Sequence, residues 1–244
     1  MYTLASLATL AFLGLANAQS NIGFGPAFSL GPTQSWIREA NTTLVLPEVP
    51  SKEADRLALW PGMGTSGGDL IQALAVSFSD PNANCGASSG QWCTWASTLQ
   101  GKKLGRLTSW TSSANQTTEQ QLGGKEVPAN PGDELVMHYE YNDETDKYDQ
   151  TVSINGEVVS SLSTSSGQAQ GWGTAVECQD DACENTRVAA HQYKSTTIVL
   201  DSADSSFKDT LVLTEADSSD FTTSDNGKTW TVETINIHAH TYNL

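Results

Sequence analysis

Basic residues are scarce in this chain: 12 lysines and arginines stand against 28 aspartates and glutamates, giving a formal net charge of −16 at pH 7. Nucleic acids and anionic membranes are bound mainly by basic surfaces, so this balance argues against both as partners. An excess of carboxylates is common in secreted proteins that work in acid, where protonation reduces self-repulsion. Solubility alone explains it equally well.

Long apolar runs are also missing. After residue 18 no segment has the roughly 20 consecutive apolar residues that a membrane-spanning helix needs. The apolar stretch at the start is too short for this role and ends in Ala16-Asn17-Ala18, the small-x-small pattern of a signal peptidase site. We therefore expect a signal peptide over 1–18 and a secreted, extracellular protein. The sequons at Asn41 and Asn115 are compatible with glycosylation on that route.

Cysteines are few, four in all, and they fall in two close pairs, Cys85 with Cys93 and Cys178 with Cys183. In a secreted chain this spacing suggests two local loops closed by disulfides. Free buried thiols stay open as the alternative. Neither pair has a second Cys or His pair at zinc-finger spacing, so we expect no metal site and no cofactor.

Several signatures of enzyme families are absent. The chain has no Gly-x-Ser-x-Gly nucleophile elbow, no glycine-rich loop that cradles a phosphate and no His-Glu-x-x-His sequence of zinc proteases. These absences remove several large enzyme classes.

Helical periodicity is scarce, whereas apolar and polar residues alternate over many short runs. Alternation of this kind predicts strands at 42–46, 135–141, 150–159, 196–200 and 229–237. Residues 68–78 fit a helical period as well, and we interpret them as a strand. Asn155-Gly156 between two such runs predicts a two-residue hairpin. The Ser- and Thr-rich stretches 107–118 and 160–171 are interpreted as surface loops.

Ten or more short strands with few helices to cover them indicate two antiparallel sheets packed face to face. We predict one domain over 19–244 with an all-β, jelly-roll β-sandwich fold. A curved sheet of this kind offers a concave groove. We expect the protein to be a monomer.

Gln72 interrupts two apolar runs, in the sequence Leu70-Ile71-Gln72-Ala73-Leu74, that otherwise indicate a buried strand. A buried amide needs hydrogen-bond partners. Either it satisfies a neighbouring backbone group, or it points into a cleft and binds a substrate carbonyl or carboxylate.

Two other strands carry imidazoles beside groups of possible catalytic use. Alternation places His138 and Glu140 on one face of their strand, where they form either an acid-base element or an ordinary polar pair. On a second strand His191 and Tyr193 share a face and could act as base and acid.

Tryptophans number seven, more than a core of this size usually needs. Aromatic rings that line a groove can stack on sugars, and we name Trp60, Trp95 and Trp172 as candidate substrate-binding residues. Packing in the core is the competing interpretation for each of them.

Four short segments, taken in order, resemble the secreted fungal glutamic peptidases, the eqolisins. These are 40–47, Leu59-Trp60-Pro61-Gly62, Leu70-Ile71-Gln72 and Pro131-Gly132-Asp133. The resemblance implies a concanavalin A-like sandwich and a catalytic pair in which a glutamate activates water and a glutamine stabilises the oxyanion. Gln72 matches the glutamine.

The glutamate of that family has no match at the corresponding strand. The nearest alignments place His191 or Thr196 there, so Glu140, Glu177 or Glu184 would have to supply the carboxylate from another position.

Residue types alone also resemble the β-sandwich polysaccharide lyases, which pair an amide with His or Tyr. Our leading prediction is an extracellular lyase that cleaves a uronate-containing polysaccharide by β-elimination. Gln72 would bind the carboxylate, His191 would be the base and Tyr193 the acid. The alternatives are an acid-active glutamic-type endopeptidase, with a protein substrate, and a lectin-like glycan-binding protein without chemistry.

Overall fold

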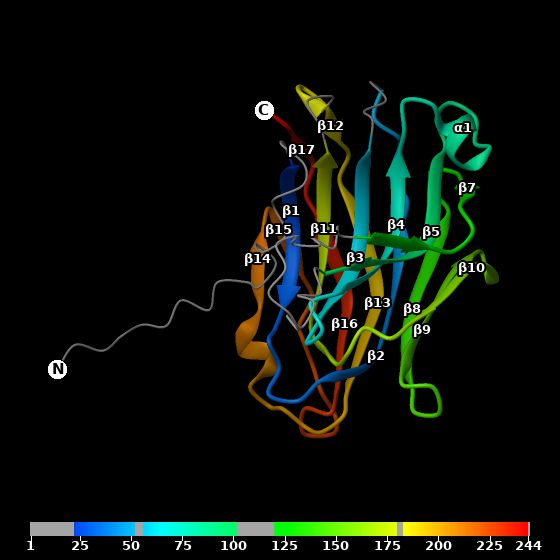
Figure 1. The fold of residues 1–244 in the computed structure, drawn as a ribbon. Helices are drawn as coiled ribbons and strands as arrows, with labels where there is room; N and C mark the ends of the chain where they lie inside the picture. The colour runs from blue at the N-terminus through cyan, green and yellow to red at the C-terminus, as the bar shows by residue number, and fades with distance from the viewer. Residues whose placement is uncertain (1–21, 52–55, 102–119, 180–182, 244) are drawn as a thin grey trace, which may run out of the picture.

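The computed structural model describes residues 22–51, 56–101, 120–179 and 183–243. Within these ranges the chain is built almost wholly of strands (Figure 1). The expected signal peptide over 1–18, the sequon at Asn115 and the stretch 107–118 lie outside the described residues. None of the helices in the described ranges is long and apolar enough to cross a membrane.

The first sheet has the strand order β14–β1–β11–β3–β4–β5, and β6 and β7 both pair with the outer edge of β5. Its antiparallel strands are β1 (Ile22–Leu30), β3 (Leu57–Thr65), β4 (Leu70–Ser77), β5 (Trp92–Gln100), β6 (Gln120–Gly123), β7 (Val127–Ala129), β11 (Ala169–Gln179) and β14 (Val212–Thr214).

The second sheet has the order β15–β16–β13–β2–β8–β9–β10 and is also antiparallel. Its strands are β2 (Ile37–Val45), β8 (Glu134–Asn142), β9 (Lys147–Ile154), β10 (Glu157–Thr164), β13 (His191–Leu200), β15 (Ala216–Ser218) and β16 (Thr229–Ile237). A single pairing of Ala169 with Ile37 joins the two sheets. The remaining elements are α1 (Pro81–Cys85), η3 (Phe207–Thr210) and the small pair β12 (Arg187–Val188) and β17 (His240–Thr241).

The core lies between the two sheets because alternate residues of each strand point into that space. In β8, Leu135, Met137 and Tyr139 are fully buried, whereas His138 between them is only half-buried. The largest fully buried side chains are Trp92, Trp172, Trp230, Tyr139, Tyr148, Tyr193, Phe28 and Phe207. The predicted two-sheet, jelly-roll-like sandwich is confirmed.

Local predictions are confirmed at two places. Residues 68–78 contain the strand β4, not a helix. The Asn155-Gly156 turn joins β9 to β10, and both residues have positive φ, 51° and 89°. Two successive positive φ values are those of the type I′ turn, whose twist matches that of the paired strands.

The surface loop predicted over 160–171 is wrong for most of its length, because β10 continues to Thr164 and β11 begins at Ala169. The hydroxyl groups of this stretch form internal hydrogen bonds. Ser160 Oγ accepts from the backbone N–H of Ala96, and Thr164 shares a hydrogen bond of 3.0 Å with Thr98. Ser160 and Thr164 thus link the two sheets, whereas the alternate serines of β10 are exposed, so a Ser- and Thr-rich composition does not by itself indicate a surface loop.

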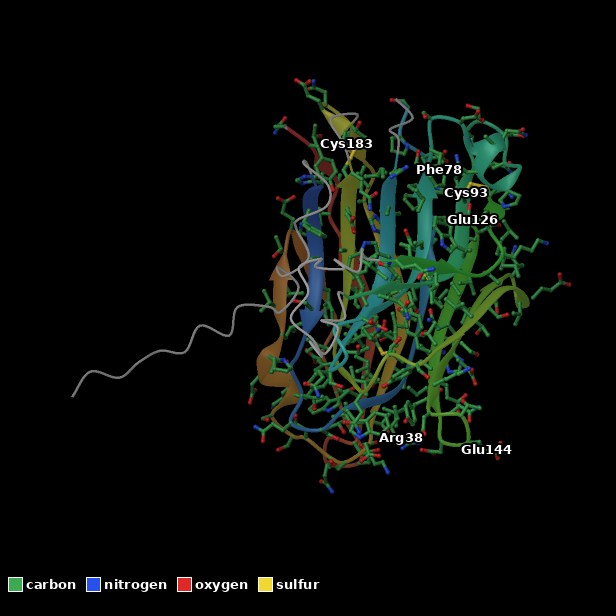
Figure 2. All side chains as sticks on the ribbon, in the orientation of Figure 1. Arg38, Phe78, Cys93, Glu126, Glu144 and Cys183 are labelled. Atoms are coloured by element: carbon green, nitrogen blue, oxygen red, sulfur yellow. A yellow bond between two sulfur atoms is a disulfide. The ribbon has the colours of Figure 1, made fainter. Side chains whose placement is uncertain are left out.

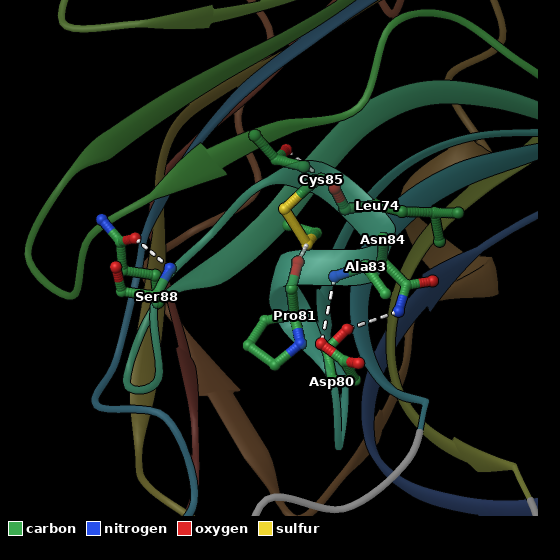
Figure 3. Close-up of a disulfide and its surroundings, with 10 residues drawn as sticks. Leu74, Asp80, Pro81, Ala83, Asn84, Cys85 and Ser88 are labelled. Carbon is green, nitrogen blue, oxygen red and sulfur yellow. Dashed lines mark hydrogen bonds between the residues drawn. A yellow bond between two sulfur atoms is a disulfide. The ribbon is translucent and has the colours of Figure 1, made fainter.

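Both predicted disulfides are confirmed, Cys85 with Cys93 and Cys178 with Cys183. The first joins the end of α1 to β5 (Figure 3). Asp80 caps α1 by accepting a hydrogen bond of 3.0 Å from the backbone N–H of Ala83. Phe78 and Cys93 lie toward this end of the sandwich, and Arg38 and Glu144 lie at the opposite end (Figure 2).

Candidate functional site

The strands β3 and β4 are buried on both of their faces. One face belongs to the core, and the other carries a second apolar cluster on the side of the first sheet that points away from the sandwich. The members of this second cluster are Ala58, Trp60, Leu70, Leu74, Val76, Ala87, Cys93, Trp95 and Ala175. We call this surface the outer face of the first sheet. By alternation and register it also carries Gln72, Ser97 and Glu177.

Gln72 stands in the middle of the outer face and is 5% exposed. No hydrogen bond of its side-chain amide is found among the described residues. The polar atoms of the Gln72 side chain are nevertheless not sealed from solvent. Its amide therefore keeps a small contact with solvent, and its donors and acceptor have no partner within the part of the chain that the structure describes.

Glycines lie beside Gln72 on the neighbouring strands. Gln72 pairs with Gly62 of β3, which in turn pairs with Gly173 of β11. A Cβ at Gly62 would come within 2.8 Å of the carbonyl oxygen of Ile71, and one at Gly173 within 2.7 Å of that of Phe28. Close approach of neighbouring strands thus requires glycine at both positions. As a result, no side chain from β3 or β11 directly faces the Gln72 amide.

Glu177 is the nearest glutamate on the outer face, and it is already held by other side chains. Its carboxylate accepts hydrogen bonds of 2.9 Å from Trp60 Nε1 and from Gln179 Nε2. Glu177 pairs with Ala58, which lies four residues along β3 from Gly62. Two strand spacings and four residues place its Cα roughly 16 Å from that of Gln72. Held by Trp60 and Gln179 at this separation, the Glu177 carboxylate does not share a water molecule with the Gln72 amide.

Two tryptophans are diagonal neighbours of Gln72 on the outer face: Trp95 pairs with Leu74, two residues along β4, and Trp60 lies two residues along β3 from Gly62. Trp60 is 4% exposed and Trp95 is 7% exposed, and Phe78 stacks on Trp95 with ring centroids 6.3 Å apart. The rings therefore form walls and do not offer an open stacking surface. Ser97, the register partner of Gln72, accepts a hydrogen bond from Gln121 Nε2 at 3.1 Å.

His191 and Tyr193 do share a face of β13, as alternation predicts, but that face belongs to the core. His191 is 6% exposed and Tyr193 is fully buried. His191 Nδ1 lies 3.0 Å from the carbonyl oxygen of Ala189, whereas its Nε2 and the Tyr193 hydroxyl are sealed from solvent and have no partner among the described residues. Burial lowers the pKa of His191 to about 4 and raises that of Tyr193 well above its ordinary value.

The three groups assigned to β-elimination are not brought together. The Gln72 side chain leaves the first sheet on its outer face, whereas His191 and Tyr193 point into the core from the second sheet. The backbone of the first sheet lies between them. Trp172, a candidate for stacking on sugars, is fully buried in the core against Phe28, with ring centroids 5.8 Å apart.

The other candidate residues lie on the outside of the second sheet. His138 Nε2 pairs with Glu39 at 2.8 Å and not with Glu140, which is exposed. This is the arrangement of a surface polar pair. Asn41 pairs in register with His138 and is half-buried.

One buried polar residue escaped the sequence analysis. Gln150 of β9 is 1% exposed and stands on the buried side of its strand between Tyr148 and Val152. A polar residue on an apolar strand face is the same signal that drew attention to Gln72. Gln150 contacts the backbone directly beneath Gln72.

A surface hollow of about 530 Å³ lies elsewhere, on the outside of the second sheet. Hydroxyl and carboxylate side chains line it, among them Thr197, Asp220 and Glu233. None of the residues predicted for the site belongs to this hollow.

No protein-family model matches the chain, and no curated protein matches its sequence. Among solved structures, a crystal structure of scytalido-glutamic peptidase with a peptide-based transition-state analogue is similar at 15% identity and a TM-score of 0.48. The match covers 86% of this chain and 97% of that one. We transfer no residue role from it.

Proposed function

We propose that this chain is an extracellular glycan-binding protein that holds a neutral polysaccharide on the outer face of its first sheet without cleaving it. The observation that carries the proposal is the amide of Gln72, which is largely buried, unpartnered among the described residues and still in slight contact with solvent. An amide that is 5% exposed is only partly hydrated, so a ligand that supplies hydrogen-bond partners recovers at most the roughly 1–3 kcal/mol that full withdrawal of an amide from water costs.

A sugar hydroxyl suits this amide because it both donates and accepts hydrogen bonds. Trp60 and Trp95 give the site apolar walls, as binding sites for small ligands and sugars commonly have. The net charge of −16 disfavours a polyanion, and a neutral polymer needs no charged group beside Gln72.

The absence of cleavage follows from what surrounds Gln72. Across Gly62 the facing position is Gly173, and Glu177 lies roughly 16 Å away. General acid–base catalysis needs a group within about 3 Å of the proton that it transfers. No described carboxylate or imidazole meets that requirement at the Gln72 amide.

A second candidate function, an acid-active glutamic-type endopeptidase, is favoured by one observation. The hydrogen bond from Trp60 Nε1 fixes a glutamate, Glu177, on the same face as Gln72. In this alternative the Glu177 carboxylate would have to leave Gln179 and extend along the sheet toward Gln72, where it would activate water for attack on a peptide bond with Gln72 as the oxyanion donor.

Titration calorimetry at pH 7 with neutral oligosaccharides of glucose, N-acetylglucosamine and mannose tests the proposal, together with chromatography of the recovered sugar. We expect binding of at least one oligosaccharide, its recovery intact, and an affinity loss of about tenfold or more in Gln72→Leu. Binding that is unchanged in Gln72→Leu, or no binding at all, contradicts the proposal.

Casein digestion at acid pH separates the peptidase alternative. The proposed binding protein leaves casein intact. Digestion that disappears in both Gln72→Leu and Glu177→Gln would establish the peptidase instead. Glu177→Gln keeps an amide oxygen as acceptor for Trp60, so a loss of digestion in this variant reports the missing carboxylate and not a displaced ring.

A further inference from the structure

Gln150 reaches across the interior of the sandwich from the second sheet to the first. Its strand, β9, belongs to the second sheet, while the groups that it contacts belong to β4 and β5. With the amide oxygen turned toward Thr98 Oγ1 at 2.6 Å, the amide nitrogen donates to the carbonyl oxygens of Ser97 at 2.9 Å and Gln72 at 3.3 Å. One buried side chain thus binds the backbone of both residues.

Gln72 and Ser97 are register partners, and their side chains stand next to each other on the outer face. Gln150 holds the same two residues from the inner side. The position of the Gln72 amide therefore depends on a residue of the opposite sheet that never reaches the outer face.

A line of hydroxyl groups fixes the orientation of the Gln150 amide. Ser166 Oγ donates to Thr164 Oγ1 at 3.1 Å, and Thr164 and Thr98 share a hydrogen bond of 3.0 Å. When Thr164 donates to Thr98, the Thr98 hydroxyl is free to donate to the Gln150 oxygen. The amide nitrogen must then face the two carbonyl groups, because every other group in the line is satisfied.

We propose that Gln150 is a positioning residue that sets the placement of Gln72 at the ligand site. The inference deepens the proposed glycan-binding function and rests on it for its effect on affinity. Its effect on the geometry of Gln72 exists without any ligand.

Amide NMR of the ligand-free protein tests the positioning directly. In Gln150→Met, which keeps the shape of the side chain but loses both donors, we expect the side-chain amide signals of Gln72 and the backbone carbonyl signals of Gln72 and Ser97 to shift. Thr42→Val is the matched control: it breaks a buried hydrogen bond between two hydroxyl groups, Thr42 with Thr196, that lies outside the Gln150 network. We expect it to leave these signals close to their wild-type positions.

Affinity for the oligosaccharide gives the second measurement. We expect a loss of about tenfold in Gln150→Met, the size of one hydrogen bond's contribution, and little change in Thr42→Val. Equal thermal destabilisation in both variants with unshifted Gln72 signals overturns the inference, since Gln150 would then only stabilise the core.

Thr98→Val keeps the test available if Gln150→Met fails to fold. It leaves Gln150 in place but removes the hydroxyl that orients its amide. A shift of the Gln72 signals in this variant supports positioning, and unshifted signals contradict it. If the wild-type protein binds no glycan, the proposed function fails while the NMR comparison still decides the role of Gln150.

Discussion

At the scale of single residues, we expect replacement of Gln72 to affect stability and ligand binding in opposite directions. Its amide has no partner among the described residues, so replacing it by Leu removes a desolvation cost and keeps most of the side-chain volume. We expect Gln72→Leu to be as stable as the wild type, or more stable, while it loses affinity. Thermal unfolding monitored by circular dichroism measures the first effect.

Thr94→Val is the matched control for this substitution. The Thr94 hydroxyl is buried and donates to the carbonyl oxygen of Leu74 at 2.7 Å, so its removal should cost about 1 kcal/mol of stability and leave affinity unchanged. A loss of 2 kcal/mol or more in Gln72→Leu would mean that the amide has a structural partner, contrary to the binding role.

His191 makes the folded chain sensitive to acid. Its pKa is about 4 when folded, against 6.5 as the ordinary value, because burial disfavours the charged ring. Between these two pH values the unfolded chain binds more protons, so stability falls as the pH decreases. The total loss is about 3 kcal/mol. We expect His191→Gln to remove most of this dependence, as measured by urea unfolding at pH 7 and pH 4.

An equally steep loss of stability in His191→Gln would assign the acid sensitivity to other groups.

At the scale of elements, the Cys85–Cys93 disulfide ties α1 to β5 at the edge of the outer-face cluster. Closing a loop of this size restricts the unfolded chain and contributes about 2–3 kcal/mol. We expect the double variant Cys85→Ala/Cys93→Ala to unfold at lower urea concentration by that amount. Because this disulfide lies outside the Gln150 contacts, oligosaccharide affinity should be nearly unchanged, and a large loss of affinity would extend the binding site toward α1.

Strands were the most predictable elements because a period of two marks a sheet with one buried face. Residues 135–141 show this clearly in β8. Further along the chain, Asn155-Gly156 correctly predicts the hairpin between β9 and β10. In β3 and β4 both faces are apolar, so alternation does not tell which face points into the core and which points away from it. The sequence marked Gln72 as buried, but only the pairing of strands shows that its side chain leaves the core.

At the scale of the whole molecule, the assignment of strands to sheets decides which residues share a site. Gln72 and His191 both stand out in the sequence, yet sequence periodicity carries no information on which of two sheets a strand joins. That depends on pairings between segments more than a hundred residues apart, such as β13 with β2. Gln150 is the reverse case: it does not stand out in the sequence, yet the fold brings β9 against β4 and β5, where its side chain contacts the backbone of Gln72 and Ser97.

Net charge and sheet assignment together lead to a prediction about polyuronates. A molecule with a net charge of −16 repels a polyanion at long range, and the groups required for β-elimination stand on opposite sides of the first sheet. We therefore expect no rise in absorbance near 235 nm, where the unsaturated product of a lyase absorbs, when the protein is incubated with polygalacturonate or alginate. A rise that His191→Gln abolishes would restore the lyase and would require the buried imidazole to reach substrate.

Affinity for a neutral oligosaccharide, by contrast, should change little between low and high salt, because no ion pair with the ligand contributes to it.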